Sequence, residues 1–155
     1  MEHEKNYESA MKSASRMLGR RMHSSCELRR KLLLSGYSQE VVNKLLAELE
    51  QAGLLNDARF AEAFAEELAG KGFGKRKIIF QIKKRGISDE IIRGVLENPV
   101  FSKDDELESA KKVLQSKMKL LNREKDPRKL KSKLYRSLAS SGFSPDIILR
   151  AIESL

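Results

Sequence analysis

The side chains that could perform catalysis or bind a metal are few in this sequence and are not grouped. Cys26 is the only cysteine, and it follows His23 by three residues, a spacing that can place both on one helix edge. Two ligands without a third nearby do not make a metal site. We therefore expect no metal, no cofactor and no catalytic residue, and we expect Cys26 to be a small, partly buried helix residue.

Other chemical motifs are weak. The Asp and Glu side chains fall in predicted first turns of helices and on acidic faces, where capping and solvation explain them. The glycine-rich basic stretch at residues 70–75 lacks the spacing of a phosphate-binding loop and follows no predicted strand. We interpret the protein as a non-enzyme.

Lysine and arginine clusters are the informative feature, because the net charge is +9 and it is unevenly distributed. Net positive charge at residues 14–35, 71–93 and 111–136 alternates with net negative charge at residues 36–70 and 94–110. A uniformly solvated surface is not expected to segregate its charge in this way. The pattern favours a polyanion or an acidic protein as a partner.

The cations at residues 75–77 begin a predicted helix, where positive charge opposes the helix dipole, so a ligand explains them better than folding does. The cations at residues 83–85 lie in the last turn of that helix, where the helix dipole favours positive charge. For them, helix stabilisation and ligand binding are equally good explanations. The run at residues 111–136 is the densest, but part of it is expected to be a solvated helix face. The candidate contact residues are Arg20, Arg21, Arg29, Arg30, Lys31, Arg59, Lys71, Lys75, Arg76, Lys77, Lys83, Lys84 and Arg85.

Aromatic residues are sparse, tryptophan is absent, and we assign most aromatic side chains to the core. Basic helices without interleaved aromatics predict contacts with phosphates rather than stacking on bases. We therefore expect DNA binding that is weak, sensitive to salt and independent of sequence.

Three glycines indicate the elements that position these cations. Gly36, Gly86 and Gly142 each follow an amphipathic stretch and precede an apolar residue, a serine and a second apolar-periodic stretch. Glycine suits the positive φ that ends a helix, and serine suits the cap that begins one. The pattern predicts a helix–turn–helix at each glycine, with spacings of 50 and then 56 residues that indicate an internal repeat.

A further helical pattern precedes each helix pair. It covers about residues 8–21 in the first unit, and it begins at Asn56 or Asp57 in the second and at Asp104 or Asp105 in the third. Together these patterns predict three tandem three-helix units. The high content of helix-forming residues and the presence of only three prolines agree with an all-α fold.

The chain is divided by these patterns into an N-terminal segment and three repeats, at residues 1–13, 14–55, 56–98 and 99–155. The charged N-terminus leads into no apolar stretch, and the apolar runs are far shorter than a membrane span. With a single cysteine, the chain fits a reducing cytoplasm. We expect a monomer with no membrane contact.

The string AGLLNDARFAEAF at residues 52–64 has a mainly structural interpretation. Gly53 ends a helix, residues 54–55 anchor the linker in the core, and Phe60 and Phe64 face inward four residues apart. The role of Arg59 stays open, because its side chain could pair with a neighbouring acidic residue or contact a partner.

That string, together with residues 72–88 (GFGKRKIIFQIKKRGIS), closely resembles the central motif of the RecX family. Residues 20–38 and 142–152 resemble the opening pattern and the last repeat of the family, in the same order. The resemblance covers nearly the whole chain beyond residue 13. One departure is His23, where the family commonly carries a second arginine after Arg21; a histidine contributes less positive charge at neutral pH.

The resemblance implies an all-α, elongated and curved tandem array of three three-helix repeats. It also implies a regulator that binds the filament of the RecA recombinase on DNA and modulates, mainly inhibits, its ATPase and strand exchange, in DNA repair and the SOS response. Two alternatives stay open. A stand-alone helical DNA-binding module would bind naked duplex tightly, and a pure protein-interaction scaffold would keep its partner after charge reversal at residues 75–77.

Overall fold

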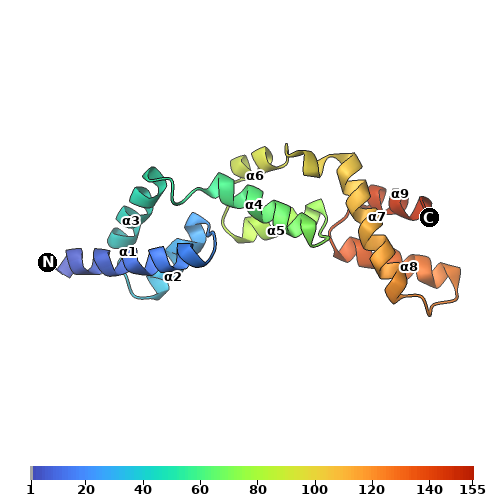
Figure 1. Cartoon of the computed structure of the whole chain (residues 1–155), viewed down its shortest axis with the longest axis horizontal. Coiled ribbons are helices and arrows are strands. Elements are labelled where there is room, and N and C mark those ends of the chain that lie inside the picture. Colours follow the sequence, from blue (N-terminus) through green and yellow to red (C-terminus); the bar gives the residue numbers. More distant parts are fainter. Residues whose placement is uncertain (1) are drawn as a thin grey trace.

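A computed structural model describes residues 2–155, with side chains from Asn6 onward, and every regular element in this range is helical (Figure 1). The elements are α1 (Glu2–Arg20), α2 (Ser25–Leu34), α3 (Gln39–Gln51), α4 (Asp57–Gly70), α5 (Lys75–Lys84), α6 (Asp89–Val95), the 3₁₀ turn η1 (Pro99–Phe101), α7 (Lys103–Leu120), α8 (Pro127–Ser140) and α9 (Pro145–Glu153). Three groups of three α-helices follow one another along the long axis in a bowed array, with α2, α5 and α8 on its lower, concave side. The predicted all-α, elongated tandem array of three-helix repeats is confirmed.

The turns between the second and third helices have the predicted geometry. Gly36, Gly86 and Gly142 have φ of 96°, 76° and 100°. The serine two residues after each glycine caps the next helix by accepting a hydrogen bond from the backbone N–H three residues further on. The sequence pattern therefore identified both the end of one helix and the beginning of the next.

Two helix starts differ from the sequence-based prediction. α1 begins at Glu2 rather than near residue 8, because no proline or glycine interrupts the helix-forming residues before that point. α7 is capped by Ser102, whose hydroxyl accepts from the Asp105 N–H, and the two aspartates that we considered as its start lie inside its first turn. At that position the positive end of the helix dipole stabilises their negative charges.

Apolar side chains gather in three separate cores, one in each group of helices. Ala10, which we placed in an N-terminal segment, is fully buried in the first core, because α1 extends the amphipathic face toward the N-terminus. Phe101, which we placed in the third repeat, is buried in the second core by the η1 turn. The division at residues 13, 55 and 98 stays a proposal.

The first and second units meet where the N-terminus of α2 lies on the α5–α6 turn. The Ser24 hydroxyl donates to the Arg85 carbonyl oxygen at 2.6 Å, and the Ser25 N–H donates to the Asp57 carboxylate at 2.8 Å. A Cβ at Gly86 would lie 2.4 Å from the Cβ of Cys26. The contact therefore requires glycine for close approach as well as for its positive φ.

The second and third units meet in the same way, with the N-terminus of α5 on the α8–α9 turn. The Gly74 N–H donates to the Ser141 carbonyl at 2.7 Å, and the Arg76 N–H donates to the Gly142 carbonyl at 3.1 Å. A Cβ at Gly74 would lie 2.5 Å from the Gly142 backbone, and one at Gly142 would lie 2.4 Å from the Cβ of Lys77. These backbone contacts fix the orientation of α5 relative to the third unit.

Candidate functional site

The solvent-facing side of α5 combines exposed cations with an exposed aromatic ring. α5 buries Ile78 and Ile82 in the second core, so residues on the opposite side of the helix face water. We call this surface the α5 basic face, and it consists of Arg76, Phe80, Lys83 and Lys84. Among the side chains that the structure describes, none of its three cations is in an ion pair. These three cations are therefore available to a ligand, and they lie together on one side of a single helix.

Lys75 and Lys77 belong to the contact with the third unit. The Lys75 backbone N–H and its charge face the carboxylate of Glu106, a residue of α7. Burial raises the pKa of Glu106 above its ordinary value, although Lys75 acts in the opposite direction. The ammonium group of Lys77 lies 4.4 Å from the centre of the Phe73 ring. Folding therefore accounts for these two cations better than the sequence-based prediction allowed, because Lys75 lies near the Glu106 carboxylate and Lys77 lies over the Phe73 ring.

Arg21 and Arg85 converge on one carboxylate at the contact between the first and second units. Each guanidinium donates to Oε2 of Glu27 at 2.8 Å, and Arg85 also lies over the Phe64 ring, 4.8 Å from its centre. Burial alone would raise the pKa of Glu27, but the hydrogen bonds from Arg21 and from the Ser24 N–H, together with the charge of Arg85, lower it below its ordinary value. Of the two ion pairs, the one from Arg85 joins the second unit to the first, while the one from Arg21 orients the Glu27 carboxylate within the first unit.

Lys31 lies against His23, which is buried with 4% of its surface exposed. The His23 Nδ1 is 3.0 Å from the Arg21 carbonyl oxygen, and its Nε2 is 2.9 Å from the Lys31 ammonium. A carbonyl only accepts and an ammonium only donates, so the neutral ring with its proton on Nδ1 satisfies both contacts. Burial, with the charges of Arg21 and Lys31, lowers the pKa of His23, although the bond to the carbonyl acts against this. His23 therefore adds no positive charge at neutral pH.

The remaining candidates of the first unit lie on its surface. Arg20 and Arg30 are exposed, while Arg29 is half-buried and donates to the side chain of Asn43 on α3. Cys26 is exposed rather than partly buried, although both its Cβ and its Sγ lie against Gly86 of the second unit. Arg20 and Arg30 therefore resemble the cations of the α5 basic face in their exposure.

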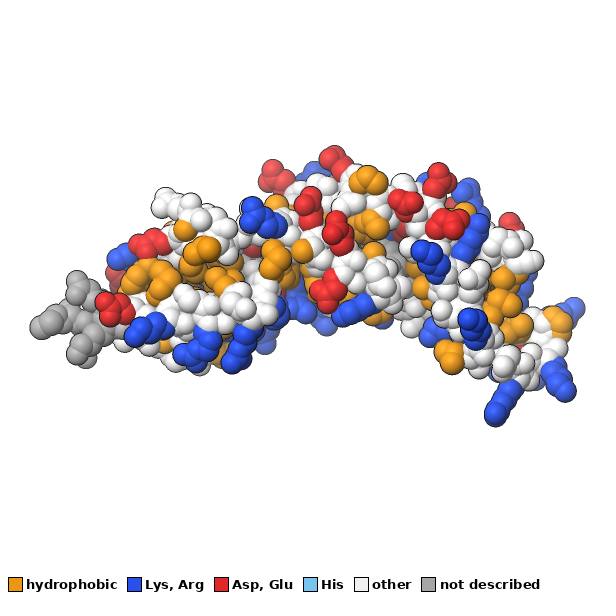
Figure 2. Space-filling model, viewed as in Figure 1, with side chains coloured by type: hydrophobic (Ala, Val, Ile, Leu, Met, Phe, Trp, Pro, Cys, Tyr) orange, Lys and Arg blue, Asp and Glu red, His pale blue; other side chains and the backbone are white. Residues whose placement is uncertain are grey.

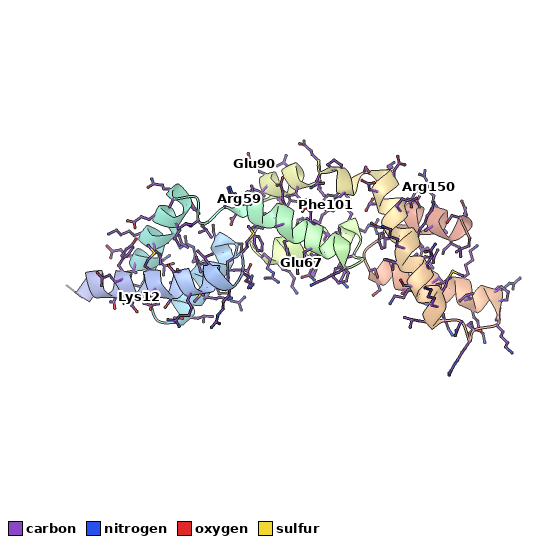
Figure 3. The ribbon with its side chains drawn as sticks, in the orientation of Figure 1. Lys12, Arg59, Glu67, Glu90, Phe101 and Arg150 are labelled. Carbon is purple, nitrogen blue, oxygen red and sulfur yellow. The ribbon has the colours of Figure 1, made fainter. Side chains whose placement is uncertain are left out.

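Arg59 and Lys71 lie apart from that face. Arg59 is exposed near the start of α4, on the same side of the view as Glu90, and it has no ion-pair partner among the described side chains (Figure 3). Lys71 pairs with Glu67 at 3.1 Å across one helical turn, and both side chains are largely exposed. Such a pair stabilises a helix by about 0.3–0.5 kcal/mol. The structure therefore does not unite all thirteen candidates in one site.

Charge of opposite sign occupies opposite edges of the molecule. Figure 2 shows Lys and Arg side chains along the lower edge below α2 and α5, and Asp and Glu side chains along the upper edge over α4 and α6. α8 extends the basic series, since five of its residues are exposed cations. They are Arg128, Lys129, Lys131, Lys133 and Arg136. Of these, Lys133 pairs with Glu124 at 2.6 Å.

Phe80 is the residue that the sequence-based analysis missed. Its side chain is 57% exposed, and the ammonium of Lys84 lies 5.3 Å from the centre of its ring. The expectation that the basic helices carry no interleaved aromatic is wrong at this position. The helical period of the sequence already predicts that Phe80 is exposed. It lies two residues from both Ile78 and Ile82, and hence on the opposite side of the helix from the buried residues.

Metal ligands and apolar helices form no site in the part of the chain that the structure describes. No group of three or more His, Cys, Asp or Glu side chains among them could hold a metal ion. No helix within residues 2–155 is both long enough and apolar enough to cross a membrane.

Three family models match the chain in order. They describe the first three-helix domain of RecX, matched at residues 10–49, the second, matched at residues 56–96, and the third, matched at residues 104–152. The structure also resembles the crystal structure of RecX from Lactobacillus salivarius, with a TM-score of 0.84, 21% identity and 97% of each chain covered. At that identity the structural match supports the fold alone.

Curated relatives share the same name, "Regulatory protein RecX". The one from Caldanaerobacter subterraneus subsp. tengcongensis is 30% identical over 143 residues, which are 92% of this chain and 68% of that protein. The one from Chromohalobacter salexigens is 34% identical over 139 residues, covering 90% and 88%. The match to the Clostridium perfringens (strain 13) protein, 30% identical over 135 residues, covers 86% of this chain and 62% of that relative.

Proposed function

The chain belongs to the RecX family, and on this premise we propose that it binds the RecA recombinase filament on DNA and restrains its ATPase and strand exchange. Its relatives are named regulatory proteins, which agrees with a role in control rather than in chemistry. In this proposal the chain acts in the cytoplasm as a monomer without a catalytic residue or cofactor. Restraint follows from added contacts, from blocked strand entry or from faster loss of the filament.

The observation that carries the proposal is the α5 basic face on the concave side of an elongated array. Arg76, Lys83 and Lys84 are exposed and lack ion-pair partners among the described residues, so they keep their charge for a ligand. DNA phosphates and an acidic recombinase surface both supply the complementary charge. The bowed shape lets α2, α5 and α8 approach one curved surface together (Figure 1).

A recombinase ATPase assay on single-stranded DNA tests the proposal. We expect the chain to lower the steady-state rate of hydrolysis. Charge reversal to Glu at Arg76, Lys83 and Lys84 should raise the concentration that is needed by about tenfold or more, because phosphate contacts dominate such affinities. A matched variant reverses three exposed cations of α3, α6 and α7, namely Lys44, Arg93 and Lys112, and should keep its potency. No change in hydrolysis at stoichiometric excess of the unaltered chain would overturn the proposal.

A stand-alone module that reads duplex DNA is the second candidate function, favoured by the three helix–turn–helix units. It requires tight, sequence-dependent binding to naked duplex. Our proposal requires weak binding that fades as salt is added. A titration of two unrelated duplexes at low and moderate salt separates the candidates, since equal and salt-sensitive affinities contradict the second one.

A further inference from the structure

The ring of Phe80 is exposed at the centre of a basic surface. Its 57% exposure contrasts with Phe60, Phe101 and Phe143, which are at most 6% exposed. A single exposed apolar side chain is ordinary in a soluble protein, so exposure alone indicates nothing. What distinguishes Phe80 is its surroundings.

Cations flank Phe80 on both sides along the helix. Arg76 lies one turn before it and Lys84 one turn after it, spacings that place all three side chains on one side of α5. The Lys84 ammonium already lies 5.3 Å from the ring centre. α5 contains no acidic residue, so no carboxylate of this helix competes for these charges. The α5 basic face thus joins an aromatic plane to cations within one turn of it.

The internal repeat gives an independent comparison. Phe80 lies six residues before the turn glycine Gly86, and the same position holds Arg30 in the first unit and Arg136 in the third. All three side chains are exposed, and α2, α5 and α8 lie on one side of the array. Arginine at this position in the first and third units adds a cation to the basic side of the array. Only the second unit has an aromatic ring at this position.

We propose that Phe80 is a stacking platform for an unpaired nucleobase, and that Arg76, Lys83 and Lys84 bind the adjoining phosphates. A nucleobase can stack on the ring only when its own face is free, so the site selects single-stranded over duplex nucleic acid. Stacking tolerates any base, because every base has an aromatic face. The proposal refines the DNA contact of the proposed function and names its ligand as a single strand.

An apolar pocket on a protein partner is a different occupant for the same ring. Insertion of Phe80 into such a pocket would also draw the neighbouring cations out of water, which is costly unless each one is paired. A single strand avoids this cost, since its phosphates meet the cations while one base covers the ring. The charge around Phe80 therefore favours nucleic acid.

The absence of tryptophan from this chain makes a direct test possible. Phe80→Trp creates a single fluorescent reporter that retains the aromatic plane. We expect an oligothymidylate to quench its emission strongly and a duplex of equal length to quench it little. Leu149→Trp, at an exposed position of α9 beside the Asp146–Arg150 pair, is the matched control and should keep its emission.

Affinity measurements complete the test. Phe80→Leu keeps an apolar side chain but loses the aromatic plane, and it should weaken oligothymidylate binding by roughly fivefold to a hundredfold. Its duplex binding should stay unchanged. Equal single-strand affinity in Phe80→Leu, or equal quenching by duplex and single strand, would overturn the proposal. A blue shift of the Phe80→Trp emission with recombinase alone, without quenching by the oligonucleotide, would assign the ring to a protein pocket instead.

The outcomes also separate this inference from the proposed function. If recombinase ATPase is restrained while the oligonucleotide leaves the Phe80→Trp emission unchanged, the stacking site is refuted and the proposed function stands. If quenching occurs but the chain has no effect on ATPase at stoichiometric excess, the stacking site stands and the proposed function is refuted.

Discussion

Substitution of single glycines by alanine should measure the strength of the contact between the second and third units. Gly36, Gly74 and Gly142 differ in a useful way. Gly36 has φ of 96° and open space where a Cβ would lie. Gly74 has an ordinary φ of −83°, but a Cβ there would lie 2.5 Å from the Gly142 backbone. Gly142 combines a φ of 100° with a Cβ position 2.4 Å from Lys77.

The expected losses of unfolding free energy follow from these geometries. Gly36→Ala carries only the cost of positive φ, about 1–2 kcal/mol. Gly74→Ala moves the start of α5 away from the α8–α9 turn and breaks two backbone hydrogen bonds, each worth about 0.5–1.5 kcal/mol, so it should cost about 1–3 kcal/mol. Gly142→Ala combines both effects and should cost about 2–5 kcal/mol.

Urea unfolding followed by far-ultraviolet circular dichroism is the assay. Because each repeat contacts mainly its neighbours, weakening the contact should also broaden the transition of Gly142→Ala and lower its m-value, as the third unit unfolds separately. Gly74→Ser supplies a capping hydroxyl but carries the same Cβ, so it should be destabilised as well. If Gly142→Ala costs no more than Gly36→Ala, and Gly74→Ala costs less than about 0.5 kcal/mol, the reasoning about close backbone contact is wrong.

Three further predictions concern ionisable groups. The folded pKa of His23 is depressed, so the unfolded state binds more protons below about pH 6.5 and unfolding free energy should fall as the pH drops through that range. His23→Gln should flatten this dependence in urea unfolding at several pH values, and an unchanged slope would contradict it. The pKa of Glu27 is also depressed, so its contribution is present above the unfolded pKa near 4.5 and is lost as the pH falls through the folded value. Glu27→Gln should cost about 1–3 kcal/mol at neutral pH because it weakens charge-assisted bonds from Arg21 and Arg85, and a loss below about 0.5 kcal/mol would refute their role. Finally, Lys84→Gln should reduce the magnitude of the slope of log affinity for oligothymidylate against log salt by about 0.7, because one fewer phosphate is neutralised. Fluorescence titration over several salt concentrations measures this slope, and an unchanged slope would contradict the prediction.

The candidate site was only partly predictable from the sequence. The cations that form the α5 basic face were all identified in advance, because charge composition is visible without a structure. Their separation from Lys75 and Lys77 was not, since it depends on Glu106 and the α8–α9 turn, which lie far along the chain. Phe80 was missed because hydrophobicity assigned it to the core, although the helical period already placed it on the opposite side from Ile78.

The structural interpretation of the string at residues 52–64 was right in most details and wrong in one. Gly53 has φ of 74°, Phe60 is buried and stacks on Phe64 at 5.5 Å, and Leu55 is in the core. Leu54, however, is 66% exposed. The backbone N–H groups of Leu54 and Leu55 both donate to the Leu49 carbonyl oxygen in the turn that ends α3, and from this turn only the Leu55 side chain reaches the core.

The sequence by itself determined the local structure of this protein. Apolar period, turn glycines and capping serines are short-range signals, because a helix closes its hydrogen bonds within four residues. The tertiary structure decided which cations remain free. Contacts such as Ser24 to Arg85, and Gly74 to Ser141, join residues more than sixty positions apart. No local pattern contains them, since they depend on how one unit packs against the next.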